Sequence, residues 1–399
     1  MPIVQPLSRR HLIKGASALA LGASLRTFGE VLGTDRILAY AGTYTGAVGN
    51  LGNGEGIYIL EMNTGTGELS DCRLAARSPS PSWIVIHPSR RYLYAVNEQS
   101  SGSVSAFAIH GMRGELTPLN TISSGGSQPA YISLDASGRY AFVANYGSGS
   151  VAVLPVLPTG ALGTVVDLRR DQGSVGSMRG TDAPRGSFAI SGHDAPHVHI
   201  VLPDPQNRFV LATDLGQDRI YVYRFDSKTG RLSENAPYTA LPTGDGPRHL
   251  AFHPNGRWLY SMQEESSTIA VFDYDERSGS LHPKQTVSTL PPNFAGTSFA
   301  SEILVAPDGR YVYAANRLHD TIAIFSVGGD GRLQRIGEVS TLGDYPGQCR
   351  IDPTGGFLYA CNRRSDNITS FRINRETGLM TFTGRYTELG SPASITFLP

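Results

Sequence analysis

Short segments in which apolar and polar residues alternate recur along most of this chain, and no stretch shows helical periodicity. Examples are residues 83–86 (WIVI), 250–252 (LAF) and 321–325 (TIAIF). Turn residues such as Gly, Asn, Asp and Ser separate these segments. The pattern predicts many short, half-buried antiparallel β-strands.

One motif, a polar turn followed by an aromatic strand, occurs six times. The copies are residues 89–94 (SRRYLY), 137–142 (SGRYAF), 206–211 (QNRFVL), 255–260 (NGRWLY), 308–313 (DGRYVY) and 354–359 (TGGFLY). They follow one another at steps of 46 to 53 residues, apart from one step of 69. Each has an alternating strand before it and a second hairpin after it. Four short strands per repeat are the sequence signature of a β-propeller blade.

The two ends of the chain supply a seventh repeat. Residues 37–43, 56–62 and the turn at 64–69 match the later three strands of a blade, and residues 392–397 match the missing first strand. Closing the ring with strands from both termini leaves no open end in the series of blades. The sequence therefore predicts an all-β fold over residues 35–399: a seven-bladed β-propeller with four-stranded antiparallel blades.

Residues 1–34 have a different character. Arg9, Arg10 and Lys14 precede a weakly apolar run at residues 15–25, which resembles a twin-arginine export signal. The run is shorter than the ~20 residues that span a bilayer. The alternative is a chance Arg-Arg pair at the start of an ordinary helix. We interpret residues 1–34 as a signal peptide and linker, cut around residues 24–34. This predicts a client of the twin-arginine export machinery that is periplasmic or otherwise exported and keeps no membrane segment.

The overall composition excludes some classes of function. Thirty-four Lys and Arg residues balance 34 Asp and Glu residues, so a nucleic-acid partner is not expected. Three cysteines are too few for a disulfide framework. Cys349 and Cys361 lie symmetrically about the turn at residues 353–356, so we expect them opposite each other on neighbouring strands. They either form a disulfide in an oxidising compartment or are two small buried apolar residues, while Cys72 is a lone thiol.

The single long step between repeats indicates an insertion of about 20 residues near residues 167–196. It carries Arg169, Arg170, Arg179 and Arg185 among Gly, Ser and Asp. An insertion of this composition either covers a binding site as a lid or is simply tolerated at the surface.

The repeat also indicates where a site would form. In such a blade the start of the first strand and the end of the second lie at the same end of the ring, around the mouth of the channel. The first-strand starts are Ser82, Ala130, His199, Arg248, Ser301 and Gly347. The next residues are Trp83, Tyr131, Ile200, His249, Glu302 and Gln348. The second strands end at Asn97-Glu98, Asn145-Tyr146, Asp214-Leu215, Gln263-Glu264, Asn316-Arg317 and Asn362-Arg363. Most residues at these equivalent positions are uncharged. The residues that can carry a charge cluster on adjacent blades: His199, Arg248, Glu264, Glu302, Arg317 and Arg363. Different chemistry on consecutive blades is what one asymmetric pocket requires.

Several segments carry a family resemblance. They are residues 42–45 (GTYT), 56–58 (GIY), 196–199 (PHVH), 214–218 (DLGQD) and 246–254 (GPRHLAFHP). Together they resemble the seven-bladed-propeller lactonases, a family that includes a bacterial 6-phosphogluconolactonase and a fungal carboxymuconate cyclase. The resemblance implies hydrolysis or closure of a lactone ring without a metal or other cofactor. It also implies a His, Arg, Glu and Arg set, which falls on His197 or His199, Arg248, Glu264 and Arg317.

Lactone hydrolysis needs an activated water, a stabilised oxyanion and a group that protonates the leaving alkoxide. We expect Glu264 to act as the general base and Arg248 to bind the carbonyl oxygen, a carboxylate or a phosphate. His199 or His197 would protonate the alkoxide, and the choice between them is open. Arg317 would hold an anionic substituent. The alternative for Arg248 and Glu264 is an ion pair that only locks neighbouring blades together.

Three further residues are expected to bind substrate: Glu302, Arg363 and Asn316. Asn316 also belongs to a series with Asn97, Asn145 and Asn362 that is expected to cap the turn after the second strand in every blade. A metal held by His197 and His199 would need a ligand from another blade, so none is expected.

The combined expectation is an exported lactonase acting on a sugar lactone or a related small anionic lactone. Export favours a lactone other than 6-phosphogluconolactone, which is a cytosolic intermediate. Two alternatives remain: an intramolecular lyase that closes a muconate ring, and a propeller that binds a protein or glycan without catalysis.

Overall fold

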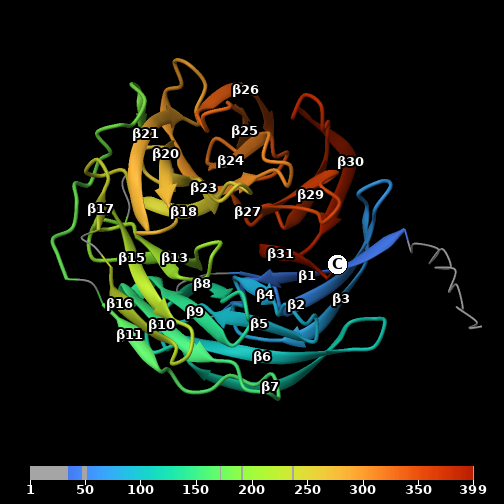
Figure 1. Cartoon of the computed structure of the whole chain (residues 1–399). Coiled ribbons are helices and arrows are strands. Elements are labelled where there is room, and N and C mark those ends of the chain that lie inside the picture. Colours follow the sequence, from blue (N-terminus) through green and yellow to red (C-terminus); the bar gives the residue numbers. More distant parts are fainter. Residues whose placement is uncertain (1–34, 47–51, 171, 190–191, 236–237, 399) are drawn as a thin grey trace, which may run out of the picture. The chain divides into compact units, whose positions relative to one another are not determined.

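The computed structural model describes residues 35–46, 52–170, 172–189, 192–235 and 238–398. The predicted export signal at residues 1–34 lies outside this range. Seven antiparallel sheets are arranged around a central axis, as Figure 1 shows, which confirms the predicted seven-bladed β-propeller. The described residues contain no α-helix, and one 3-10 turn, η1 (Tyr146–Ser148), follows a strand of the third blade. Among them there is also no helix long and apolar enough to cross a membrane.

The blades are numbered here in chain order, with strands given from the axis outward. Blade 1 contains β31 (Pro392–Leu398), β1 (Arg36–Thr43), β2 (Gly56–Asn63) and β3 (Leu69–Arg77). Blade 2 contains β4 (Ile84–Ile86), β5 (Tyr92–Asn97), β6 (Ser103–His110) and β7 (Glu115–Ser123). Blade 3 contains β8 (Pro129–Leu134), β9 (Tyr140–Asn145), β10 (Ser150–Pro155) and β11 (Asp167–Arg169).

Blade 4 contains β13 (Val198–Pro203), β14 (Phe209–Asp214), β15 (Arg219–Asp226) and an outer edge made of β16 (Arg231–Glu234) and β17 (Thr239–Ala240). Blade 5 contains β18 (Pro247–Phe252), β19 (Trp258–Gln263), β20 (Thr268–Asp275) and β21 (Ser280–Ser288). Blade 6 contains β23 (Phe299–Val305), β24 (Tyr311–Arg317), β25 (Thr321–Val327) and β26 (Leu333–Ser340). Blade 7 contains β27 (Pro346–Ile351), β28 (Phe357–Asn362), β29 (Asn367–Ile373) and β30 (Met380–Glu388).

The ring closes where the two ends of the propeller meet. β31, from the C-terminal end, pairs antiparallel with β1, with Tyr40 opposite Thr396 and Leu38 opposite Leu398. This pairing confirms the predicted split blade. With β31 in place, blade 1 has an innermost strand like the other six blades, and the ring of described blades is closed.

The hydrophobic core is divided among the blade interfaces. Buried side chains form seven clusters, one between each pair of adjacent blades. The inner strands are apolar on both faces because each face packs on a different neighbour. In β28, for example, Tyr359 packs against blade 1 and Leu358 packs against blade 6.

Tyrosine hydroxyls link neighbouring blades. In five of the seven blades the second strand carries a buried tyrosine whose hydroxyl donates to a glycine carbonyl in the next blade, while blades 3 and 4 have Phe142 and Leu211 at that position. The bonds are Tyr40 to Gly114 (2.7 Å), Tyr94 to Gly160 (3.0 Å), Tyr260 to Gly331 (3.1 Å), Tyr313 to Gly378 (3.0 Å) and Tyr359 to Gly67 (2.9 Å). The last of these joins blade 7 to blade 1. Gly331 has a φ of +86°, and a Cβ there would lie 2.4 Å from the Trp258 ring, so the turn requires glycine.

The insertion between blades 3 and 4 begins later than expected, because residues 167–169 form β11 and pair with β10. Its described residues contact the connecting loops of blades 4, 5 and 6. The Gly176 amide donates to the Gly216 carbonyl (2.8 Å), and the Ser177 amide donates to Thr243 Oγ1 (2.8 Å). Further along, β12 (Ser187–Phe188) pairs in parallel with β22 (Gly296–Thr297), just before blade 6.

The expected position of the two buried cysteines is wrong. Cys349 pairs with Ala360, and Cys361 pairs with Gln348, so the cysteines are offset by one residue. Side chains alternate between the faces of a strand, so this offset places the thiols on opposite faces of one sheet. Cys361 packs against blade 1 and Cys349 against blade 6. Both are free and buried, and they act as small apolar residues.

Candidate active site

β-bulges direct side chains from the innermost strands into the mouth of the ring. In five first strands, one residue near the mouth is skipped in the pairing register. The skipped residues are Ala130, His199, Arg248, Gly347 and Ala393. In β23 the shift spans Ser301 and Glu302. A bulge bends the strand and changes where a side chain points. All five skipped residues line one central pocket.

A second ring of pocket residues comes from the ends of the second strands. Tyr44, Glu98, Tyr146, Glu264 and Arg363 each follow such a strand directly, counting β1 for blade 1. Arg317 is the last residue of β24. Blade 4 is the exception, because its equivalent residue, Leu215, is fully buried away from the pocket. The six polar or aromatic residues therefore reach the mouth from six blades.

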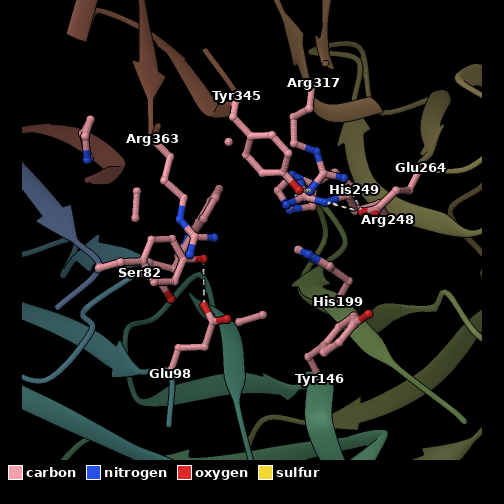
Figure 2. A pocket seen from close by; sticks show the side chains of 16 residues that line it. Ser82, Glu98, Tyr146, His199, Arg248, His249, Glu264, Arg317, Tyr345 and Arg363 are labelled. Atoms are coloured by element: carbon pink, nitrogen blue, oxygen red, sulfur yellow. Dashed lines mark hydrogen bonds and ion pairs between the residues drawn. The ribbon is translucent and has the colours of Figure 1, made fainter. Parts of the chain in front are cut away.

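Figure 2 shows the residues that line the resulting pocket, whose unfilled space of about 800 Å³ includes solvent at its open part. Ser82, Trp83, His249, Tyr345 and Pro392 complete its lining. Trp83 and His249, which line it, pack their rings against each other and against Tyr131, with centroids 4.3 to 5.6 Å apart. Of the expected site residues, His199, Arg248, Glu264, Arg317 and Arg363 line this pocket together.

Glu264 is shared by two arginines. Its Oε2 lies 2.9 Å from Arg248 Nε and 2.7 Å from Arg317 Nη2, and all three side chains are about nine-tenths buried. Burial, followed by the adjacent Arg317 charge, lowers the pKa of Arg248. Burial alone would also lower the pKa of Arg317, but the Glu264 carboxylate raises it. A single carboxylate thus keeps two guanidinium groups side by side in a partly dehydrated site.

Arg248 is oriented from three sides. Besides Glu264, its Nη1 donates to the Ser301 carbonyl and lies 3.3 Å from His249 Nε2. His249 Nδ1 lies 2.8 Å from Glu302 Oε1. A carboxylate accepts here, so Nδ1 carries the proton and Nε2 accepts from Arg248. These contacts use Nε and Nη1, and Nη2 has no hydrogen-bond partner among the described residues.

Arg317, by contrast, is largely occupied. Its Nε donates to the Phe299 carbonyl (3.2 Å), its Nη2 donates to the Ala300 carbonyl (3.2 Å), and its Nη1 donates to the Tyr345 hydroxyl (3.3 Å). A guanidinium has five N–H groups, and three of them are used by these bonds and a fourth by Glu264. Arg317 therefore contributes mainly a fixed positive charge, since only one of its N–H groups is left to donate to a ligand.

His199 lies beside this arginine pair. Its ring is 5.0 Å from the His249 ring and 5.6 Å from the Tyr146 ring, and its buried Nδ1 has no hydrogen-bond partner among the described residues. Burial, reinforced by the positive charge of Arg248, lowers the pKa of His199 well below its ordinary value of 6.5. The imidazole is therefore neutral at neutral pH, and one of its ring nitrogens has a lone pair that can accept a hydrogen bond.

The other expected residues lie outside the pocket lining. His197 stacks on Tyr146, with centroids 4.3 Å apart, and its ring nitrogens contact the Tyr146 carbonyl and Asp194. Glu302 acts through His249 rather than facing the pocket. Asn316 is fully buried in blade 6, where its amide bonds Thr289, in the segment that leads from blade 5, through both its oxygen and its nitrogen. Across the turn after its own strand, its Nδ2 lies 3.4 Å from Thr321 Oγ1.

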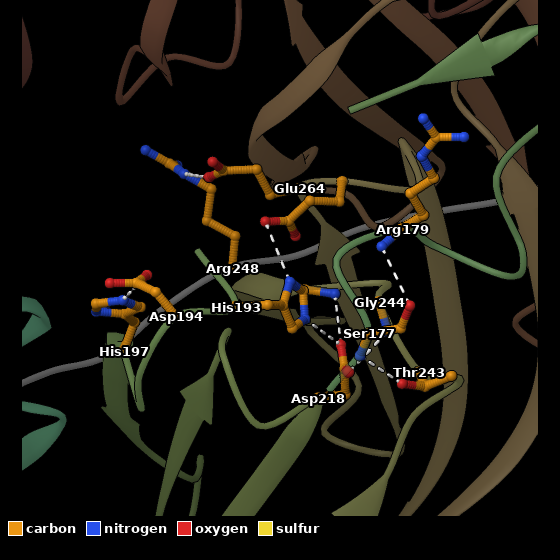
Figure 3. A network of polar contacts seen from close by, with 12 residues as sticks. Ser177, Arg179, His193, Asp194, His197, Asp218, Thr243, Gly244, Arg248 and Glu264 are labelled. Atoms are coloured by element: carbon orange, nitrogen blue, oxygen red, sulfur yellow. Dashed lines mark hydrogen bonds and ion pairs between the residues drawn. The ribbon is translucent and has the colours of Figure 1, made fainter. Parts of the chain in front are cut away.

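The insertion supports the site from outside. His193 lies between two carboxylates, 3.0 Å from Asp218 Oδ1 and 3.7 Å from Glu265 Oε1, and Figure 3 shows its contact with Asp218. The His193 side chain is fully buried. Asp218 also accepts the amides of Gly244 (2.7 Å) and Gly246 (2.9 Å). The described part of the insertion therefore anchors the loops on either side of Arg248 and Glu264, while lining none of the pocket.

Sequence reasoning overlooked Glu98, Tyr146, His249, Tyr44 and Tyr345. The first three stood in the repeat comparison at the correct positions. The comparison of equivalent positions selects only charged residues that break the pattern on adjacent blades, and these three residues do not meet that criterion. Tyr345 directly precedes the proline that begins β27, at the position of Gln128, Gly246 and Ser391 in other blades, and the repeat comparison did not extend to that position. No group of three or more His, Cys, Asp or Glu residues that could hold a metal occurs within the described ranges.

Comparison with known proteins gives consistent matches. The family described as "Lactonase, 7-bladed beta-propeller" matches residues 38–397. The chain is 35% identical over 365 residues to 6-phosphogluconolactonase of Bacillus subtilis (strain 168), which covers 91% of this chain and 99% of the relative. It is also similar to the solved structure of a periplasmic gluconolactonase from Pseudomonas aeruginosa. That structure has a TM-score of 0.81 and 30% identity, and the match covers 91% of this chain and 99% of that one.

Glu264→Gln is expected to reduce the free energy of unfolding by about 3 kcal/mol, because it leaves two buried guanidinium groups without their shared anion. Glu61→Gln is the matched control. It breaks an ion pair whose arginine is 66% exposed, and should cost less than about 1 kcal/mol. Urea denaturation of both variants measures the difference. Equal, small losses would contradict a stabilising role for the shared carboxylate.

Proposed function

The chain belongs to the seven-bladed β-propeller lactonase family, and we propose that it hydrolyses the ring ester of a small sugar lactone or a related anionic lactone. One observation carries the proposal. A neutral, buried imidazole, His199, faces the same pocket as Arg248, whose Nη2 hydrogens have no partner among the described residues. A base and an oxyanion donor in one pocket are what ester hydrolysis requires.

The proposed reaction starts with the lactone carbonyl oxygen at Arg248 Nη2. His199 takes a proton from a water molecule as the water oxygen bonds to the carbonyl carbon. The resulting oxyanion is stabilised by Arg248, with the fixed charge of Arg317 nearby. The tetrahedral intermediate then re-forms the carbonyl and expels the ring oxygen. His199 returns its proton to that oxygen, which gives the open hydroxy acid.

The structure favours a role for Glu264 that differs from the expected general base. Its Oε2 holds both arginines, so its main contribution in this scheme is to position them. In this scheme His199 both removes the proton from the attacking water and returns it to the ring oxygen. We assign the proton transfers to His199 rather than His197, because His199 lines the pocket whereas His197 stacks on Tyr146 outside the lining.

We also propose that the protein is exported, as the Arg9-Arg10 segment indicates. The relative from Pseudomonas aeruginosa described as a periplasmic gluconolactonase supports this location. Outside the cytosol, a lactone without a phosphate becomes the more accessible substrate.

An assay of proton release tests the enzymatic proposal, with glucono-1,5-lactone, its 6-phosphate and a muconolactone as substrates. We expect hydrolysis of at least one of the sugar lactones. His199→Ala and Arg248→Ala should each lower kcat/KM at least ~100-fold, because each removes a group that acts in the transition state. His110→Ala, at an exposed end of β6, is the control and should behave as wild type.

The outcomes of this assay separate the candidate functions. Activity that survives both substitutions would place the reaction elsewhere on the ring. Turnover of the muconolactone alone would favour the intramolecular lyase. A folded protein inert toward every substrate would favour a propeller that only binds.

Replacing Arg9 and Arg10 together with Lys tests export. Recognition by the twin-arginine machinery depends on the pair, so the double variant should stay in the cytoplasmic fraction while wild type is exported. Immunoblots of fractionated cells measure the distribution, and an Arg36→Lys variant controls for substitution outside the signal. An unchanged distribution in the double variant would contradict the proposed route.

A further inference from the structure

A second hollow lies beside the central pocket, at the loops of blades 7 and 1. Asn53, Arg364, Asp366 and Ser391 contribute to its lining, and its unfilled space of about 910 Å³ includes solvent. Tyr345 and Arg363 line both hollows, and Figure 2 shows them at the upper side of the central pocket. The Tyr345 hydroxyl accepts a hydrogen bond from Arg317 Nη1 (3.3 Å), so this shared wall touches the arginine pair. The proposed reaction leaves the second hollow unused.

Blade 7 differs from the other blades in the charge that it places at this hollow. Arg364 is the second residue after Asn362, which ends the second strand of the blade. The residues at the equivalent place in blades 1 to 6 are Thr45, Gln99, Gly147, Gly216, Glu265 and Leu318. Of these six only Glu265 is charged, and it is buried. Arg364 is therefore the one exposed charge in the series.

The Arg364 guanidinium rests on the shared wall. Its Cζ lies 3.9 Å from the centroid of the Tyr345 ring, and its side chain has no hydrogen-bond partner among the described residues. A guanidinium has five N–H groups, so Arg364 can donate to a ligand in the second hollow.

Asp366 supplies an acceptor in the same hollow. Its Oδ2 accepts from Asn53 Nδ2 (2.7 Å), and its Oδ1 accepts from the Ser391 amide (2.8 Å). A carboxylate has about four lone-pair sites, so these two bonds hold the side chain in place and leave capacity for a ligand. The second hollow thus offers a charged donor and a charged acceptor together.

This pair of charges suits a neutral group that is rich in hydroxyls. A sugar hydroxyl both donates and accepts, so one sugar ring can bond to Arg364 and to Asp366. Hydrogen bonds between hydroxyls and charged side chains are stronger than those between neutral groups. A phosphate or carboxylate would gain from Arg364 but would be repelled by Asp366.

We propose that the second hollow binds a sugar unit attached to the lactone ring, so that lactones of oxidised disaccharides are substrates. The inference rests on the proposed function, since it places the lactone carbonyl at Arg248 and His199 in the central pocket. The attached sugar then passes the wall formed by Tyr345 and Arg363 and reaches Arg364 and Asp366. The ester hydrolysis itself is unchanged, because the second unit only adds binding contacts.

The test compares glucono-1,5-lactone with cellobiono-1,5-lactone, which has the same lactone ring and a glucosyl unit attached to it. Arg364→Ala removes an exposed side chain, so the fold should be unaffected. We expect kcat/KM for cellobiono-1,5-lactone to fall about tenfold, mainly through KM, and the value for glucono-1,5-lactone to stay within about twofold. Arg385→Ala is the control, because Arg385 is a 57% exposed arginine of the same blade, paired with Glu68. It should change neither value.

A loss for cellobiono-1,5-lactone no larger than the loss for glucono-1,5-lactone would overturn the inference and leave the proposed function standing. Hydrolysis of glucono-1,5-lactone alone by wild-type protein would do the same. Wild-type protein inert toward both lactones would instead overturn the proposed function. In that case calorimetric titration with cellobiono-1,5-lactone decides the subsite. Binding that Arg364→Ala weakens supports it, and absent or unchanged binding overturns it.

Discussion

The β-bulge at the mouth end of the innermost strands is the constraint on which the site depends. A regular strand would alternate its side chains between the two blade interfaces, and none would point along the axis. Skipping one residue in the register turns His199 and Arg248 into the central pocket and leaves the rest of each strand packed in the core. The same device in the other blades brings Ala130, Gly347 and Ala393, whose small side chains leave room for a ligand.

The blades differ in the charged side chains that they place at the pocket. Glu264 holds two guanidinium groups together, and their charge and the burial of the site keep His199 neutral. Glu302 acts at one remove, because it fixes the tautomer of His249, which in turn accepts from Arg248. The insertion reinforces the same region through His193 and Glu265, next to Glu264. The base, the oxyanion donor and their supports thus lie on blades 4 to 6, and Glu98 faces them from blade 2.

The sequence was sufficient for the fold because the repeat is explicit and its missing strand is present at the other terminus. It also located the positions that line the pocket, since strand ends in equivalent repeats fall at one end of the ring. The sequence was not sufficient where the outcome depends on a one-residue difference in how two strands pair. The spacing of Cys349 and Cys361 about a turn suggested that they face each other, but the turn between β27 and β28 pairs Gln348 with Cys361 and Cys349 with Ala360, one residue away from that expectation. The same effect separates His199, which is skipped in the pairing, from His197, which lies just before β13. Glu98 was missed because charge was weighed only on adjacent blades.

The central claim is that His199 acts as a neutral base because burial and two arginines depress its pKa. The pH dependence of kcat/KM for lactone hydrolysis, corrected for the spontaneous reaction, tests this most directly, because it reports the ionisation of the free enzyme's base. A depressed pKa keeps the imidazole unprotonated in acid, so the account predicts a rate that is unchanged as the pH falls through 6.5 and declines only well below it. A decline with its midpoint at or above pH 6.5 would contradict the account.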